Sequence, residues 1–486
     1  MREREHENDA RPDLSGVVAA ALAPLVPVRA VTVRADGAGA RRLLVEVLPE
    51  PGPAGDEDDE AVVVESWQAV FEDAYGLVAD DDGPEAGRLA GWTDSFTGRP
   101  IGAAHMAEWV DTTVERLARL GPRAVLEIGA GTGLLARPLV ERLGVREYTA
   151  TDFSAEAVRL LRRLGDDLRR GGPEAVITVA EAAADVPAPP AAAPGGYDTA
   201  VVNSVVQYFP SVAYLESVIA ATLPRMAPGG HVFLGDLRDS RLLEHFAVLK
   251  HELRREPGPR SGLRLDHVAV ELAGDVELSV DPGYLADLPR RFPAITAVEL
   301  APRLGAAPTE MTLFRYDAVL HVGCQAPAEA GPWRPAARIG LDELDWLLAG
   351  DAAAFGVSGI ANARLGEARR LHAARRAEPV DGPGAPGLDP EAVHRLAERH
   401  GRPVRLRWSL DGRPGDYDAW FPGLDADEQA HYRVAVPAAA PGAGCRQQLV
   451  PPAVSEDWRR AVCEALARHA PDAGEPPEVE FVLALG

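Results

Sequence analysis

Three glycines at alternate positions follow a short apolar run that ends in a carboxylate, in the stretch VLEIGAGTGLL. The glycines are Gly129, Gly131 and Gly133, and the carboxylate is Glu127. Glycine lets the backbone adopt positive φ and approach a ligand closely. A dinucleotide-binding turn has its third glycine one position later, where this chain has Leu134. The spacing therefore favours a ligand that is not held through a phosphate.

A second carboxylate, Asp152, ends the strand-like run EYTATD at an interval that suits an acid binding ribose hydroxyls. Glu127 would repel a phosphate but attract a cationic amino-acid group. No Gly-x-x-x-x-Gly-Lys-Ser/Thr loop occurs in the sequence to bind a phosphate elsewhere. These features predict a ligand with a ribose diol, a positive charge and no phosphate, a description that S-adenosylmethionine fits. For the glycines alone, a tight turn without a ligand is the alternative.

The elements around these residues alternate between strand-like and helix-like runs, which is typical of parallel strands with helical crossovers. The strand-like runs are AVLEIG, EYTATDFS, AVITVAE, YDTAVVNSVVQYF and HVFLGDL, and helical runs such as AEAVRLLRRLGDDLRRG separate them. We expect an α/β fold with a doubly wound, mostly parallel sheet. Its ligands would bind beyond the carboxyl ends of the strands.

Composition limits the possible partners. The 486 residues include 50 Lys and Arg against 74 Asp and Glu, a net charge of −24, which argues against nucleic acid and anionic membranes as partners. No apolar run approaches the roughly 18 residues of a membrane span, and the N-terminus lacks a signal-like segment, so we expect a cytoplasmic protein. The three cysteines are widely spaced and the histidines form no cluster, so we expect no metal.

Two motifs, LEIGAGTG and TATDFS, resemble the first motif and the ribose-binding acid of class I methyltransferases. Longer segments resemble, in order, the methyltransferase domains embedded in nonribosomal peptide synthetases: GWTDSFTGRPI, VVNSVVQYFPSVAYLESVI, MAPGGHVFLGDLRD and TEMTLFRYDAVLHVG. The resemblance spans Trp67 to Val322 and continues more weakly through GIANARL and RWSLDGRPGDYDAWF. It implies S-adenosylmethionine as cofactor. The residues expected to bind it are Glu127, Gly129, Gly131, Gly133, Asp152, Phe153, Asp185, Asn203, Ser204 and Gln207.

The same resemblance implies residues for the acceptor. Tyr208, Glu310 and Arg315 are the candidates for catalysis, with Glu310 on an expected polar strand where it would hold an ammonium and accept its proton. The candidates for binding the acceptor are Trp92, Ser95 and Thr97 in an expected lid, and Asp236 and Arg238 after a strand. Ordinary structural roles are the alternatives: a cap for Asn203, Gln207, Tyr208 or Asp236, a salt bridge for Arg238, core for Trp92, and solvated positions for Glu310 and Asp185.

Proline- and glycine-rich stretches divide the chain. Linkers are expected at Pro49 to Glu60, Ala377 to Pro390 and Val436 to Gly444. The terminal pieces are each too small to bury a core, so we expect them to pack together. They resemble the two halves of the small adenylation subdomain that such methyltransferases interrupt. The predicted divisions are 1–60 (first half and linker), 61–120 (helical lid), 121–325 (cofactor-binding core), 326–444 (small α+β accessory region) and 445–486 (second half).

The implied function is N-methylation of an aminoacyl or peptidyl group carried as a thioester on a peptidyl carrier protein. One alternative is methylation at the α-carbon of a carrier-bound aminoacyl or thiazoline thioester. Another is a noncatalytic scaffold that binds a synthetase. Basic segments at His251 to Arg264, Arg290 to Pro293 and Glu367 to Arg376 are possible carrier-docking sites, although the sequence favours a solvated helix face for each of them.

Overall fold

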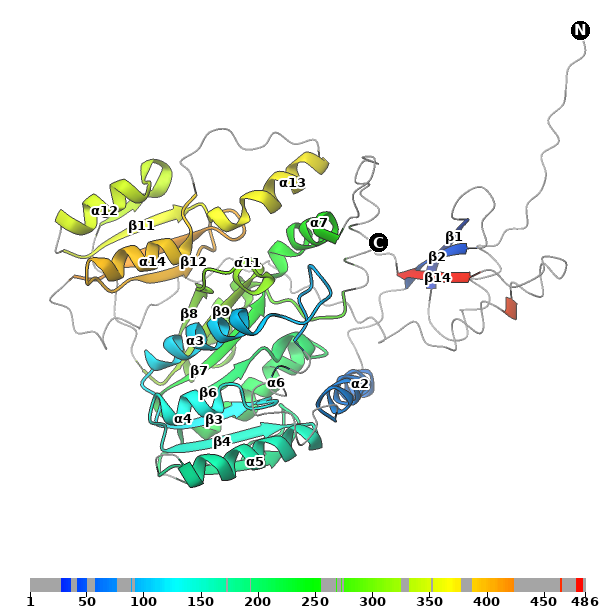
Figure 1. Cartoon of the computed structure of the whole chain (residues 1–486), viewed down its shortest axis with the longest axis horizontal. Helices are drawn as coiled ribbons and strands as arrows, with labels where there is room; N and C mark the ends of the chain where they lie inside the picture. Colours follow the sequence, from blue (N-terminus) through cyan, green and yellow to red (C-terminus); the bar gives the residue numbers. More distant parts are fainter. Residues whose placement is uncertain are drawn as a thin grey trace, which may run out of the picture. The chain divides into compact units, whose positions relative to one another are not determined.

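The computed structural model describes residues 28–35, 42–49, 57–76, 89, 92–171, 174–192, 194–254, 268, 272, 275–324, 332–350, 353–376, 387–423, 464–465 and 478–483 (Figure 1). Two compact units are distinguished. The smaller comprises Met1–Asp59, Gly262–Val276 and Gln448–Gly486, and the larger comprises Glu60–Ser261 and Glu277–Gln447. The residues of chemical interest all lie in the larger unit.

The smaller unit contains a three-stranded sheet in the order β1-β2-β14. β1 (Val28–Ala35) pairs with β2 (Arg42–Pro49) in antiparallel fashion, and β14 (Glu478–Leu483) pairs with β2 in parallel. The first and last of the described strands, blue and red in Figure 1, therefore share one sheet. Helices expected at LSGVVAAALAPLV and DWRRAVCEALARHAP lie outside the described residues, apart from 464–465.

A seven-stranded sheet, in the order β5-β4-β3-β6-β7-β9-β8, forms the centre of the larger unit. Its strands are β3 (Ala124–Ile128), β4 (Glu147–Asp152), β5 (Val176–Glu181), β6 (Tyr197–Asn203), β7 (Met226–Arg238), β8 (Ile295–Pro302) and β9 (Arg315–Val322). β3 to β7 are parallel, whereas β9 is antiparallel to both β7 and β8. The chain winds outward from β3 in both directions, which confirms the predicted doubly wound, mostly parallel fold class.

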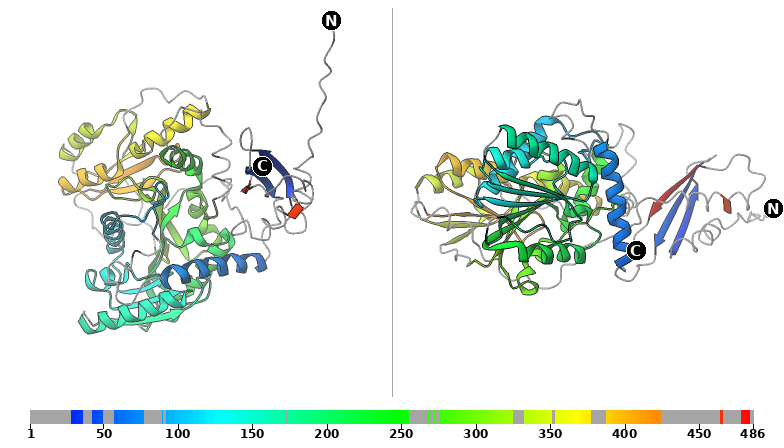
Figure 2. Two further views of the ribbon diagram at one scale, coloured as in Figure 1. Left: turned by 45° about the vertical axis from the view of Figure 1, so that its right-hand side comes forward. Right: turned by 90° about the horizontal axis from the view of Figure 1, so that it is seen from below.

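Helices cover both faces of this sheet (Figure 2). Adjacent residues of β3 show the two sides: Val125 belongs to a hydrophobic cluster with α3, α4 and α5, whereas Leu126 belongs to a cluster with α6 and α7. Burial on both faces explains why the strands read as continuous apolar runs. The helices are α2 (Glu57–Gly76), α3 (Ala103–Ala118), α4 (Ala136–Glu141), α5 (Ala155–Gly171), α6 (Val212–Thr222), α7 (Leu243–Arg254), α9 (Pro282–Ala286), α10 (Leu288–Arg291) and α11 (Glu310–Phe314), with 3-10 turns η2 (Val206–Tyr208), η3 (Leu223–Arg225) and η4 (Ser240–Leu242).

Residues 332–423, here called the accessory region, form a small α+β structure with a four-stranded sheet in the order β10-β11-β13-β12. Its core includes Leu344, Phe355, Leu396 and Phe421. No helix in the described part of the chain is long and apolar enough to cross a bilayer. The elements of the accessory region are β10 (Trp333–Pro335), η5 (Ala336–Arg338), α12 (Leu341–Gly350), β11 (Phe355–Ile360), η6 (Ala363–Leu365), α13 (Gly366–Arg376), α14 (Pro390–Arg399), β12 (Arg405–Trp408) and β13 (Tyr417–Phe421).

The structure differs from the sequence expectation at three element boundaries. Glu57 to Glu60, expected as linker, form the first turn of α2, where acidic residues are favoured by the helix dipole. β6 ends at Asn203 instead of continuing through VVQYF, because Ser204 has a φ of 56° and a 3-10 turn follows. Glu310 begins helix α11 instead of lying in a strand, because Thr309 and Thr312 form a reciprocal capping box there.

Candidate active site

A cavity of about 360 Å³ lies at the carboxyl ends of β3, β4 and β6. Glu127, Asp152 and Asn203, at the ends of these strands, all line it. This is the edge where doubly wound sheets bind ligands. The predicted site residues that line the cavity are Trp92, Ser95, Glu127, Gly129, Gly131, Asp152, Phe153, Asn203, Ser204, Gln207, Tyr208, Glu310 and Arg315.

The three glycines of the turn after β3 have different neighbours. All have positive φ, at 70° for Gly129, 54° for Gly131 and 78° for Gly133. A Cβ atom on Gly129 would lie 2.5 Å from Cγ2 of Val205, so a side chain there would displace the segment after β6. A Cβ on Gly133 would meet Leu164 of α5 at 2.5 Å, and Gly133 does not line the cavity. Gly133 therefore permits helix packing, whereas Gly129 and Gly131 form the cavity wall.

Glu127 is buried at the end of β3, and its Oε2 accepts a hydrogen bond of 2.5 Å from the hydroxyl of Tyr148. Burial raises the pKa of Glu127 to about 7; the bond from Tyr148 lowers that pKa and the charge of Asp152 raises it. A cation in the cavity would stabilise the ionised form of this carboxyl group. Its position and its electrostatics thus suit a positively charged ligand.

Asp152 connects the glycine turn to the end of β4. Its Oδ2 accepts the backbone N–H of Gly131 at 2.8 Å, and its Oδ1 accepts that of Ser154 at 3.0 Å. Burial raises the pKa of Asp152, although these backbone bonds oppose the change. The carboxylate is therefore fixed in orientation beside the turn and lines the same cavity as Glu127.

Three buried oxygens of residues in the cavity wall lack a hydrogen-bond partner among the described residues. They are Asn203 Oδ1, Gln207 Oε1 and Glu310 Oε2. Buried acceptors are nearly always paired in native proteins, so these favour a ligand that brings N–H or O–H groups. S-adenosylmethionine has an ammonium and two ribose hydroxyls, and its features match this wall. Within the described residues, no three His, Cys, Asp or Glu side chains are grouped to hold a metal.

Comparison with known proteins shows what the chain is similar to. A family described as Methyltransferase domain matches residues 126–232. Chondramide synthase cmdD of Chondromyces crocatus is 36% identical over 443 residues, which are 86% of this chain and 11% of that protein. CymA of Salinispora arenicola, named as a probable nonribosomal peptide synthetase, is 38% identical over 414 residues, 84% of this chain and 5% of that protein. Residues 126–232 therefore carry a methyltransferase domain, and the chain as a whole is similar to segments of nonribosomal peptide synthetases.

This methyltransferase thus corresponds to a small part of the length of these relatives. Among solved structures, magnesium protoporphyrin IX methyltransferase from Synechocystis with bound S-adenosylmethionine aligns with 56% of this chain and 99% of its own, at 13% identity and a TM-score of 0.33. The cavity wall of the present chain, with two carboxylates at the strand ends and acceptor oxygens that lack a partner among the described residues, fits S-adenosylmethionine as the cofactor of this methyltransferase.

Helix α2 contributes cavity residues that the sequence analysis missed. Phe71 and Tyr75 line the cavity, and Trp67 lies one turn before Phe71 on the same face. The ring centroids of Trp67 and Phe71 lie 4.7 and 5.0 Å from that of Tyr208. The Tyr75 hydroxyl lies 3.1 Å from the place where a Cβ of Gly131 would be. Aromatic residues at a spacing of four were the available signal for this helix.

Glu72, the next residue after Phe71, fixes α2 against α5. Its Oε1 accepts the backbone N–H of Ala155 at 2.6 Å, and its Oε2 accepts that of Glu156 at 3.2 Å. These are N–H groups in the first turn of α5, which has no intrahelical partners for them. The side chain of Gln68 also donates to the carbonyl of Phe153 at 2.8 Å. α2 is therefore attached to the cofactor end of the methyltransferase by polar contacts as well as aromatic packing.

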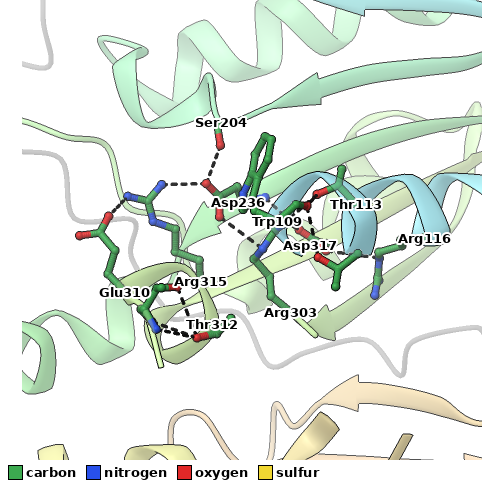
Figure 3. Close-up of polar contacts among 12 residues, drawn as sticks. Trp109, Thr113, Arg116, Ser204, Asp236, Arg303, Glu310, Thr312, Arg315 and Asp317 are labelled. Atoms are coloured by element: carbon green, nitrogen blue, oxygen red, sulfur yellow. Dashed lines mark hydrogen bonds and ion pairs between the residues drawn. The ribbon is translucent and has the colours of Figure 1, made fainter. Parts of the chain in front are cut away.

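A buried group of ion pairs lies behind the acceptor end of the cavity (Figure 3). Arg315 contacts Glu310 Oε1 through Nη2, and its Nη1 lies 3.0 Å from Asp236 Oδ2. Arg303 lies 3.4 Å from Asp236 and 2.8 Å from Asp317. Burial would raise the pKa of Asp236, but Arg315 and Arg303 lower it below the ordinary value. The group holds Arg315 and Glu310 in fixed positions.

Several predicted site residues lie outside the cavity wall. Asp236 was expected to contact the acceptor, but its side chain is fully buried because it pairs with two arginines. Arg238 instead pairs with Glu277 at 3.1 Å. Asp185 lies behind Tyr214, whose hydroxyl it accepts at 2.8 Å, and Thr97 is exposed on its loop. Of the expected acceptor contacts in the lid, Trp92 and Ser95 line the cavity.

Proposed function

We propose that this methyltransferase methylates the nitrogen of an aminoacyl or peptidyl group that a peptidyl carrier protein holds as a thioester. The observation that supports this proposal best is the state of Glu310. Its side chain is buried in the cavity wall, one carboxyl oxygen pairs with Arg315, and the other has no partner among the described residues. An ammonium would supply the missing hydrogen bond and charge.

The chemistry needs alignment of two reactants and removal of one proton. When bound, S-adenosylmethionine supplies a methyl group on a sulfonium, which is already activated. Oε2 of Glu310 accepts an N–H of the acceptor ammonium and takes its proton, which leaves the nitrogen lone pair free. The nitrogen–methyl bond then forms as the sulfur–methyl bond breaks. Burial raises the pKa of Tyr208, so its hydroxyl stays protonated and serves to orient the acceptor.

The ion pair with Arg315 favours nitrogen over carbon as the acceptor. The α-proton of a thioester is far less acidic than that of an ammonium, so its removal needs a strong base. A carboxylate whose other oxygen is bound to a guanidinium is a weak base. A weak base of this kind can still take the proton of an ammonium, which is far more acidic, once the second oxygen has accepted its N–H.

The test is to load candidate aminoacyl groups on a carrier protein, add labelled S-adenosylmethionine, and locate the label by fragmentation. We expect the label on nitrogen. The Glu310→Gln variant should be slower and should recover at higher pH, where the acceptor amine is already neutral. Glu299→Gln, on β8 and paired with His321 away from the cavity, is the matched control and should behave as the native protein. A label on the α-carbon, or a Glu310→Gln variant with native turnover at all pH values, contradicts the proposal.

The proposal also includes the peptidyl carrier protein as partner and an origin for the sheet β1-β2-β14. Pairing of β14 with β2 is what two halves of one adenylation subdomain would form if the methyltransferase had been inserted between them. Of the basic segments considered for carrier docking, Arg290 pairs with Asp287 and Arg370 pairs with Glu367 within their own helices or turns. Arg291 also pairs with Glu216, and Arg369 pairs with Asp416, so several cations of these two segments are already bound to carboxylates of this chain. Most of the third, His251 to Arg264, lies outside the described residues.

A further inference from the structure

The loop that precedes Glu310, residues 303–309, is held by charged side chains from two other parts of the fold. Arg364, in the accessory region, donates from Nη1 to the carbonyl of Arg303 at 2.8 Å and from Nη2 to that of Gly305 at 2.6 Å. It also donates to the carbonyl of Thr312, in α11, at 3.3 Å. One guanidinium thus binds backbone on both sides of Glu310.

Two carboxylates hold the backbone N–H groups of the same loop. Glu391, in α14 of the accessory region, accepts the N–H of Gly305 at 2.9 Å. Glu108, in α3, accepts those of Ala306 and Ala307 at 2.8 and 3.1 Å. Every one of these contacts is to backbone, so the three side chains specify where the loop lies and not which residues it contains.

Arg364 is itself fixed by the frame of the accessory region. Its side chain is only 6% exposed and lies 2.9 Å from Asp389. Asp389 is the N-cap of α14 and accepts the N–H of Glu391 at 2.8 Å. Burying a guanidinium is costly unless its charge and its donors are satisfied. Here the N–H donors of Arg364 are satisfied by carbonyls of the loop. The loop therefore stabilises the buried arginine, and the arginine fixes the position of the loop.

We propose that the accessory region acts as a positioning element for the acceptor acid, with Arg364 as its principal positioning residue. This inference rests on the proposed role of Glu310. Glu310 is the first residue of α11, and Arg364 binds the carbonyls that precede and follow it. A shift of the loop would therefore move the free carboxyl oxygen relative to the acceptor. A misplacement of about 1 Å can cost about 100-fold in rate.

The test compares Arg364→Lys with Arg369→Lys. Lysine keeps the charge but cannot reach three carbonyls in a fixed fork. Arg369 is the matched control, because it also pairs within the accessory region, with Asp416 at 2.7 Å and the carbonyl of Pro414 at 2.7 Å, without contacting the loop. We expect kcat with a carrier-bound acceptor to fall about 10- to 100-fold in Arg364→Lys only. The Kd for S-adenosylmethionine should be unchanged in both variants. Native kcat in Arg364→Lys overturns the inference. A loss of affinity for S-adenosylmethionine as large as the loss in kcat also overturns it.

A double-mutant cycle separates positioning from a general structural role. In a Glu310→Gln background, Arg364→Lys should cause little further loss, because an absent base cannot be misplaced. Independent, multiplicative losses would refute positioning. If Arg364→Lys does not fold, Glu391→Ala removes one N–H acceptor from the loop and should give the same pattern in weaker form; native kcat there also overturns the inference. Native turnover in Glu310→Gln would instead contradict the proposed function itself.

Discussion

Replacing Glu127 with glutamine tests how the cavity recognises a cation. A carboxyl group with a pKa of about 7 in the folded chain and 4.5 in the unfolded chain costs the folded state about 3 kcal/mol when it is ionised. Since the folded pKa is the higher one, this cost is absent below pH 4.5 and complete above pH 7. The native protein without cofactor should therefore lose stability as the pH rises through that window. Glu127→Gln should remove the loss, because glutamine still accepts the Tyr148 hydroxyl and carries no charge.

The same variant should weaken cofactor binding while it stabilises the free protein. S-adenosylmethionine is expected to bind the ionised form of Glu127, so binding below pH 7 must release a proton. The Kd of the native protein should therefore rise about tenfold for each pH unit below 7. In Glu127→Gln the Kd for S-adenosylmethionine should be higher at pH 8 than that of the native protein. It should also be nearly independent of pH between 6 and 8.

Calorimetry at pH 6, 7 and 8, in buffers of different ionisation enthalpy, measures both the Kd and the number of protons released. Urea unfolding of the free protein over the same range measures the stability change. Glu147→Gln, a buried carboxyl at the opposite end of the neighbouring strand β4, is the control and should leave the cofactor profile unchanged. A native Kd that does not vary with pH, or a variant that keeps the native profile, would refute the assignment of Glu127 to the cationic end of the ligand.

Three further substitutions test the surrounding contacts. Tyr148→Phe removes the bond that lowers the pKa of Glu127, so the midpoint of the cofactor pH profile should move above 7; an unmoved midpoint contradicts that role. Gly129→Ala combines positive φ with a 2.5 Å contact to Val205, and should cost more than about 1 kcal/mol in urea unfolding and abolish cofactor binding; native affinity in calorimetry rules out the close approach. Asp236→Ala leaves two buried guanidinium groups short of a partner and should cost about 3–5 kcal/mol in urea unfolding, and a loss under 1 kcal/mol would show that the ion pairs are dispensable.

The cofactor end of the cavity was predictable because its determinants are local. Glu127, the glycines and Asp152 each end or follow a strand that the apolar pattern reveals, and parallel pairing of β3 with β4 places them together. The contribution of α2 was not predictable from those patterns. Its aromatic face is recognisable in the sequence, but only tertiary packing determines that Tyr75 lies beside Gly131 and Phe71 beside Tyr208.

At the acceptor end of the cavity, the position of a residue after a strand does not by itself predict whether its side chain lines the cavity. Asp236 follows an apolar run just as Asp152 does, yet it is buried among arginines. The difference arises from β8 and β9, which extend the sheet beside β7 and bring Arg303 and Arg315 to that edge. Asp236 also has a φ of 63°, where the pairing of β7 with β9 becomes irregular. The local sequence around Asp236 does not predict this pairing, because the arginines come from segments that are distant in the chain.

The charges of the cavity wall fit those of S-adenosylmethionine and of the proposed ammonium acceptor. Among the described residues, four carboxyl groups and two guanidinium groups line the cavity: Glu127, Asp152, Glu277 and Glu310 against Arg254 and Arg315. Glu277 also pairs with Arg238 behind it, and the wall still has an excess of carboxylates, which suits the net positive charge of S-adenosylmethionine and of the proposed ammonium acceptor. Methyl transfer removes the sulfonium charge, so the wall attracts the cofactor product less strongly than the cofactor. With the cavity empty, the raised pKa of Glu127 lets a proton neutralise part of the excess. The electrostatic arrangement that favours binding of both cations therefore also favours release of the product.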